Sequence, residues 1–249
     1  MIGAAVKYLL LVIFISLLTS CSSPSPVLLG TPSQNLTTSM TSVIPQTTSP
    51  APLVDLAPLF ADTTLKQIEV KIQQNILGTA GTLINANLRN DSDEYRIFSL
   101  TCGYTFTPKV NEDLQQMILI QPLVFSIEPL GWLNVYPVTV CIEPDKGVPA
   151  IGENYNFGPM AEGDLKKLAD CACGSTIAPD DTIALFTQQL AFWMVALGMN
   201  SGQIISMTPE EFTELLASKE VDQETLDSLR GYLPLVKLKT IAVLKKCGF

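Results

Sequence analysis

The hydrophobic pattern of this chain changes its period near the middle, and that change limits the folds that the chain can adopt. Between residues 66 and 142, short runs alternate apolar and polar residues, as at Ile68, Val70 and Ile72, which is typical of half-buried strands. Between residues 164 and 249, the apolar residues recur at helical spacing. We therefore expect an α+β fold in which the strands precede the helices.

The strand region, residues 61–142, is divided by turn signals such as Pro108 and Pro122. Six or seven short strands at this spacing predict an antiparallel β-sandwich of the Ig/FnIII-like kind. Pro137 indicates an edge strand or a bulge, and residues 143–163, rich in Pro and Gly, are expected to form a loop. The expected strands are residues 68–72, 84–88, 95–101, 116–120, 123–127 and 132–142.

The helix signals in residues 164–249 predict a helical subdomain. Thr208-Pro209-Glu210-Glu211 combines an N-cap, a proline in the first turn and a capping-box glutamate. Asp180 or Asp181 can cap a longer helix that Gly198 ends. That helix is apolar on nearly every side and shorter than the roughly 20 residues of a membrane span, so we expect it to be buried in the core. Further helices are expected at residues 164–170 and 222–231 and from Pro234 onward.

The N-terminus has the features of a secretory signal peptide. Lys7 precedes an apolar run, Tyr8 to Ile15, that is too short to span a membrane. Leu18-Thr19-Ser20-Cys21 then resembles the lipobox of bacterial lipoproteins, in which the cysteine is diacylated and becomes the new N-terminus. The resemblance implies that residues 1–20 are removed and that Cys21 carries the lipid anchor of an extracytoplasmic protein, at the cell surface or in the periplasm.

Residues 21–60 are predicted to form a disordered, lipid-anchored tether. Within them, residues 22–52 contain no charge, and Ser, Thr and Pro occupy 19 of these 31 positions. Such a segment buries too little apolar surface to offset the entropy lost on ordering.

The composition excludes several classes of function. The chain has no histidine, which rules out a Ser-His-Asp triad, a Cys-His pair and any histidine-ligated metal. The net charge is −9 and becomes −10 when Lys7 is lost with the signal peptide, so the chain lacks the basic surface of a nucleic-acid binder. We expect a non-catalytic protein without metal or cofactor, attached to the membrane through its lipid.

The cysteines give an odd number once the lipidated one is set aside. Five remain, and five cannot all pair within one chain. If Cys141 is the odd one, the other four can form two disulfides in any of three connectivities. As alternatives, the thiols stay reduced, or Cys171-Ala172-Cys173 contributes to a thiolate metal site with one of the remaining two. The candidate disulfide cysteines are Cys102, Cys171, Cys173 and Cys247.

Gln189 lies in the middle of the apolar helix, on one face with Leu185 and Phe186. A buried amide must find hydrogen-bond partners or cost roughly 1–3 kcal/mol. The simplest role for Gln189 is structural, in which its side chain bonds loop backbone within residues 143–163.

A second interpretation comes from two short motifs. Gln189-Leu190-Ala191-Phe192-Trp193 and Val140-Cys141-Ile142 together resemble the motifs of bacterial thioester domains in Gram-positive surface adhesins. In that family a cysteine follows an aromatic residue or Leu at a strand end, and a helix carries Thr-Gln-x-Ala-Ile/Val-Trp. Here Gln188 stands in place of Thr, Phe192 in place of Ile or Val, and Val140 in place of the aromatic residue or Leu.

The resemblance implies an internal thioester. The Cys141 thiol and the Gln189 carboxamide would condense with release of ammonia, and an amine of a surface protein or another ligand would then attack the bond and be captured. A thioester persists only where water is excluded. Phe186, Phe192 and Trp193 are the residues expected to form its apolar surround.

Three functions agree with these patterns: a surface binding or adhesion module with the thioester, a structural or ligand-binding envelope lipoprotein without covalent chemistry, and a hydrolase. The hydrolase would need two carboxylates about 5–10 Å apart in one cleft. Trp132 and Tyr136 are expected to pack in the core, with a ligand face on the sheet as the alternative.

Overall fold

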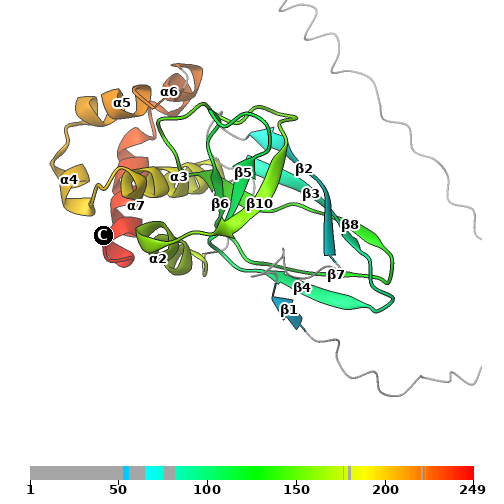
Figure 1. Ribbon diagram of the computed structural model, residues 1–249. Coiled ribbons are helices and arrows are strands. Elements are labelled where there is room, and N and C mark those ends of the chain that lie inside the picture. Colours follow the sequence, from blue (N-terminus) through cyan, green and yellow to red (C-terminus); the bar gives the residue numbers. More distant parts are fainter. Residues whose placement is uncertain are drawn as a thin grey trace, which may run out of the picture. The chain divides into compact units, whose positions relative to one another are not determined.

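The computed structural model describes residues 53–55, 65–75, 82–175, 177–178, 181–219, 221 and 223–249 (Figure 1). All of them belong to one compact unit, Thr47–Phe249. The strands come first along the chain and the helices follow, so the expected α+β class with C-terminal helices is confirmed. The predicted signal peptide, Cys21 and most of the predicted tether lie outside the described residues.

The strands form two sheets. In the smaller sheet, the order is β1-β4-β7, with β1 (Leu53–Asp55) parallel to β4 (Arg96–Leu100) and β7 (Leu123–Ile127) antiparallel to it. In the larger sheet, the order is β10-β5-β6-β9-β3-β2, and β8 also pairs with β3. The strands of the larger sheet are β2 (Leu65–Asn75), β3 (Thr82–Asn90), β5 (Tyr104–Pro108), β6 (Met117–Leu119), β8 (Trp132–Val135), β9 (Val138–Cys141) and β10 (Tyr155–Met160).

The strands differ from the expectation at four places. Residues 143–163 are not a loop throughout, because β10 lies within them and pairs with β5. The expected strand at 132–142 is two strands, since Pro137 cannot donate a ladder hydrogen bond and β8 ends before it. β5 was not expected, and β1 lies inside the predicted tether.

Gly158 explains why a strand rich in Gly and Pro can join the sheet. A β-carbon at this position would lie 2.3 Å from the Thr105 hydroxyl oxygen on β5. Only glycine allows this close approach, and the register between β10 and β5 shifts between Phe157 and Met160. The glycine that suggested a loop is therefore what allows the strand to pair.

The helices are α2 (Gly163–Ala172), α3 (Thr182–Ala196), α4 (Ser201–Ser206), α5 (Pro209–Ala217), α6 (Gln223–Leu229) and α7 (Leu233–Lys246). The predicted capping box of α5 is present, with Thr208 and Glu211 bonding each other's backbone. Asp181 caps α3, whose end is marked by Gly198 at a φ of 70°. α4 was not expected, although Asn200 and Gln203 form a second capping box there.

α3 is the central helix of the C-terminal part. Every residue from Leu185 to Val195 is buried, which confirms the expectation of a core helix. The helix contacts β9 on one side and α2 and α7 on others, so it joins the sheet to the remaining helices. Among the described residues, no helix is long and apolar enough to cross a membrane.

Candidate functional site at Cys141 and Gln189

The Gln189 side chain contacts β9 at a point where β9 extends beyond the neighbouring strand β3. β3 begins at Thr82, which is paired with Thr139, so Cys141 extends past the described end of β3. On the other side of β9, Ile142 donates to Gln116 and Val138 accepts from Ile120, both at the β6 side. Because backbone groups alternate along a strand, those of Cys141 point away from β6, to the side where β3 has ended.

The Gln189 side chain bonds both backbone groups of Cys141. The Cys141 N–H donates to Gln189 Oε1 at 2.8 Å, and Gln189 Nε2 donates to the Cys141 carbonyl at 2.6 Å. One amide thus takes the place that a neighbouring strand would occupy. The sequence predicted a partner within residues 143–163; the partner is instead Cys141, at the end of the strand just before them.

The pair is closed off from solvent. Cys141 and Gln189 both have an exposed fraction of 0%. Phe186, Phe192 and Trp193, the three residues expected around them, are equally buried and belong to the same hydrophobic cluster. The chain therefore holds a thiol and a carboxamide, from residues 48 positions apart, in a dry apolar environment.

A polar network lies beside the pair and was missed from the sequence. Gln115 is fully buried, and its Oε1 accepts from Trp193 Nε1 at 3.3 Å while its Nε2 donates to the Lys146 carbonyl at 2.9 Å. The Tyr155 hydroxyl donates to the Gln115 carbonyl at 3.0 Å. These bonds fix the indole of the helix motif against the segment that follows Cys141. No local pattern marks Gln115, because its partners come from three distant parts of the chain.

Tyr155 stays protonated in this environment. Burial is the main cause that raises the pKa of Tyr155 above its ordinary value, and electrostatic interactions with Cys141, Glu153 and Glu143 add to the effect. The phenol is therefore a lasting hydrogen-bond donor and not a base.

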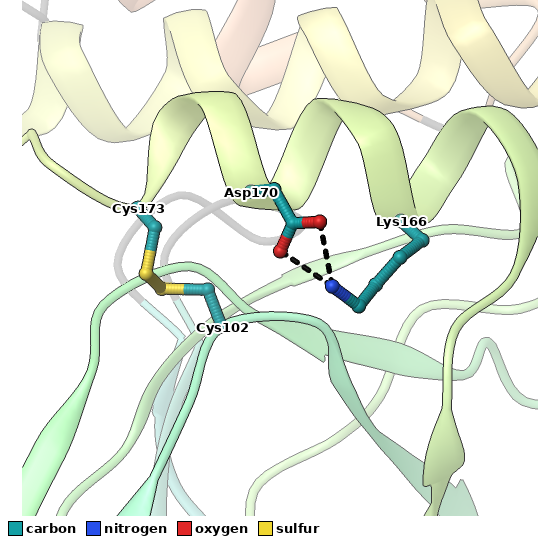
Figure 2. Close-up of a disulfide and its surroundings, with 4 residues drawn as sticks. All are labelled: Cys102, Lys166, Asp170 and Cys173. Atoms are coloured by element: carbon teal, nitrogen blue, oxygen red, sulfur yellow. Dashed lines mark hydrogen bonds and ion pairs between the residues drawn. A yellow bond between two sulfur atoms is a disulfide. The ribbon is translucent and has the colours of Figure 1, made fainter.

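Two disulfides fix α2. Cys102, between β4 and β5, is bonded to Cys173 at the end of α2, as Figure 2 shows. Cys171 is bonded to Cys247 at the end of α7. These are the four cysteines that the sequence singled out, in one of the three connectivities left open.

The ion pair on α2 adds little to this anchoring. Figure 2 also shows Lys166 and Asp170 one turn apart on the helix, with the Lys166 Nζ 2.5 Å from Asp170 Oδ1. Exposed pairs at this spacing contribute about 0.3–0.5 kcal/mol. The ion pair lies within α2, whereas the disulfide joins the helix to the segment between β4 and β5.

The disulfides also decide the cysteine alternatives. Cys171 and Cys173 are each oxidised, so neither is available as a thiolate ligand, and the thiolate metal site considered from the sequence is wrong. Among the described residues, no three His, Cys, Asp or Glu side chains are grouped as a metal site. Cys141 forms no disulfide with any cysteine in the described part of the chain.

Trp132 and Tyr136 were expected to pack in the core, and that expectation is wrong. The exposed fractions of their side chains are 67% and 48%. β8 is bordered by solvent on its outer face, and the burial pattern alternates from Trp132 to Tyr136 with these two residues outward. The core is filled instead by the intervening Leu133 and Val135.

An apolar groove lies elsewhere in the described structure. It is formed between α5, α6 and α7, with Phe212, Leu226 and Ile241 among its lining residues. Neither Cys141 nor Gln189 lines it. The candidate covalent site is thus a closed interior contact and not an open cleft.

Comparison with known proteins identifies no relative. No family model, curated protein or solved structure matches the chain. The functional argument therefore rests on the geometry described above.

Proposed function

We propose that this chain is a surface lipoprotein that captures amines covalently through an internal thioester between Cys141 and Gln189. The observation that supports the proposal is the paired hydrogen bonding that joins the Gln189 carboxamide to the Cys141 backbone, within the apolar core. These bonds bring the Gln189 acyl group to the residue that carries the thiol, although the two residues are 48 positions apart in the chain.

The first step forms the bond. The Cys141 sulfur attacks Cδ of Gln189, the Cδ–Nε2 bond breaks, and the amide nitrogen leaves as ammonia after taking the thiol proton. The Cys141 N–H already donates to Oε1 at 2.8 Å, so it is aimed at the oxygen on which negative charge develops during the attack. The hydrogen bond from Nε2 to the Cys141 carbonyl holds the amide plane in place before reaction.

The second step captures the ligand. A primary amine attacks the thioester carbonyl, the C–S bond breaks, and the proton lost by the amine restores the Cys141 thiol. The product is an amide between the amine and the Gln189 side chain. Each molecule reacts once, so the protein acts as a covalent binder and not as an enzyme with turnover. Burial protects the thioester from hydrolysis until an amine reaches it.

The proposal includes the wider organisation of the chain. Cys21 carries the lipid, the part of the predicted tether that precedes β1 links the folded part to the membrane, and the two sheets form a sandwich of the Ig/FnIII-like kind. The disulfides Cys102–Cys173 and Cys171–Cys247 support an extracytoplasmic location, because such bonds persist in oxidising compartments.

Intact mass tests the covalent chemistry. We expect the full chain, analysed without reduction, to gain the mass of one methylamine when it is unfolded in the presence of that amine. Comparing treated with untreated samples of the same chain cancels any modification at the N-terminus. Cys141→Ala should gain nothing, because it has no thiol with which to form the bond.

Gln188→Leu is the matched control, since it removes the neighbouring carboxamide without burying a charge and leaves Gln189 intact. It should gain methylamine as the unchanged chain does. An unchanged mass of the full chain in methylamine, with the Cys141 thiol fully alkylated on unfolding, would exclude the thioester. The Gln189–Cys141 contact would then be a structural one in a lipoprotein without covalent chemistry.

A further inference from the structure

The strand register places two aromatic and three amide side chains on one solvent-facing surface of the larger sheet. In β8, Trp132 pairs with Arg89 of β3, and Asn134 pairs with Asn87. These side chains are exposed or half-buried, whereas Leu88 and Ala86 between them are fully buried. We call this surface the outer face: Trp132, Asn134, Tyr136, Asn85, Asn87 and Arg89.

The aromatic side chains of the outer face are exposed to solvent. Trp132 has an exposed fraction of 67% and Tyr136 one of 48%. Four residues of strand separate them by about 13 Å, so they stand at the two ends of one row with Asn134 between. Large exposed aromatic side chains on a sheet mark interaction surfaces, since burying them in the protein's own core would otherwise be favoured.

The charges of the outer face cancel. Arg89 Nε lies 2.7 Å from Asp91 Oδ1, and on the adjacent β2 Lys71 Nζ lies 2.5 Å from Glu69 Oε1. The chain as a whole carries a net charge of −9. This surface is therefore locally neutral in an acidic protein, which suits a neutral ligand and disfavours nucleic acid and other polyanions.

From this combination, we propose that the outer face binds a neutral polysaccharide chain. A pyranose ring presents an apolar C–H face, which stacks on an aromatic ring, and a rim of hydroxyl groups, which exchange hydrogen bonds with amides. Trp132 and Tyr136 supply the stacking rings, and Asn87 and Asn134 supply donors and acceptors between them. The inference does not depend on the thioester.

Affinity electrophoresis of the full chain in mild detergent tests this proposal. The native gels contain hydroxyethylcellulose, soluble xylan, galactomannan or dextran, with polygalacturonate as the charged comparison. We expect at least one neutral polymer to retard the protein. Trp132→Ala should weaken that binding about tenfold, the factor for one lost ring stack. Trp132→Phe, which keeps a ring, should retain most of it.

Tyr232→Ala is the matched control, because Tyr232 is an aromatic residue with an exposed fraction of 52% that lies outside the outer face. It should bind as the unchanged chain does. The proposal is overturned if no neutral polymer retards the protein, if only polygalacturonate does, or if Trp132→Ala and Tyr232→Ala behave alike. A thermal unfolding curve for each variant shows that the sheet is intact.

Discussion

At the scale of single residues, Gln189 does for Cys141 what a neighbouring strand does elsewhere in the sheet. Its carboxamide has the same donor and acceptor as a peptide group, and it satisfies both backbone groups of Cys141 in the core. A residue that bonds backbone so completely stabilises the fold whether or not it reacts. The reactive and structural roles of Gln189 can therefore be measured separately.

In the Cys141→Ala chain, which cannot form the thioester and keeps the Gln189 amide, replacing Gln189 by Leu should lower the free energy of unfolding by about 2–5 kcal/mol, because it leaves the buried N–H and carbonyl of residue 141 without partners. Urea denaturation measures the change. Gln188→Leu is the control: Gln188 Oε1 is buried without a hydrogen-bond partner in the described structure, so its removal should cost little. Equal losses for the two variants would contradict the role given to Gln189.

Tyr155 gives a prediction for alkaline pH. Its folded pKa is raised above the unfolded value of about 10, so the native state keeps the proton longer than the unfolded chain does. The stability from this difference is fully present below pH 10 and is lost as the pH rises above that value.

Tyr155→Phe should be less stable than the unchanged chain by about 1 kcal/mol at neutral pH, because it loses the hydrogen bond to Gln115. This difference in the free energy of unfolding should shrink above pH 10, because only the unchanged chain has the Tyr155 hydroxyl and loses the stability that its raised pKa provides. Urea denaturation at pH 8 and at pH 11 measures the difference. A constant difference would show that Tyr155 titrates normally in the folded protein.

At the scale of secondary structure elements, α2 is held at one end by two disulfides. Cys102–Cys173 closes a separation of 71 residues and Cys171–Cys247 one of 76. Such long closures remove much of the entropy of the unfolded chain. The bonds connect the strands, α2 and the end of α7, so both parts of the fold depend on them.

Replacing Cys102 and Cys173 together by Ser should lower the free energy of unfolding by about 2–5 kcal/mol. Urea denaturation of the double variant, with Cys171–Cys247 kept oxidised, measures the loss. Lys166→Ala removes the exposed ion pair on the same helix. It should lower the free energy of unfolding by less than about 1 kcal/mol, which is typical of surface ion pairs. A double variant as stable as Lys166→Ala would show that the disulfide does not anchor α2.

The elements also show what sequence patterns can predict. The capping box at Thr208 and the apolar run of α3 are local signals, and both gave the correct helix. β10 was missed because Gly158 and Pro159 suggest a loop, whereas the close approach to Thr105 requires glycine there. An alternating pattern predicts that β8 has two different faces, but it does not show which face the core covers. The exposure of Trp132 depends on that second fact.

At the scale of the whole molecule, the candidate site depends on one long-range contact. The order of strands and helices follows from local periodicity, but the packing of α3 against β9 does not. Only the resemblance of two short motifs suggested that Cys141 and Gln189 would meet. Gln115 and Tyr155, which complete the surroundings, carry no motif and were found from the structure alone.

We propose above that a thioester joins Cys141 to Gln189 until an amine displaces the Cys141 sulfur. Peptide mapping of the full chain after unfolding in isotope-labelled methylamine and an alkylating reagent tests this most directly. The account predicts the label on Gln189 and on no other glutamine, together with a newly alkylated Cys141. Label absent from Gln189, with Cys141 alkylated equally in the absence of amine, would contradict the claim.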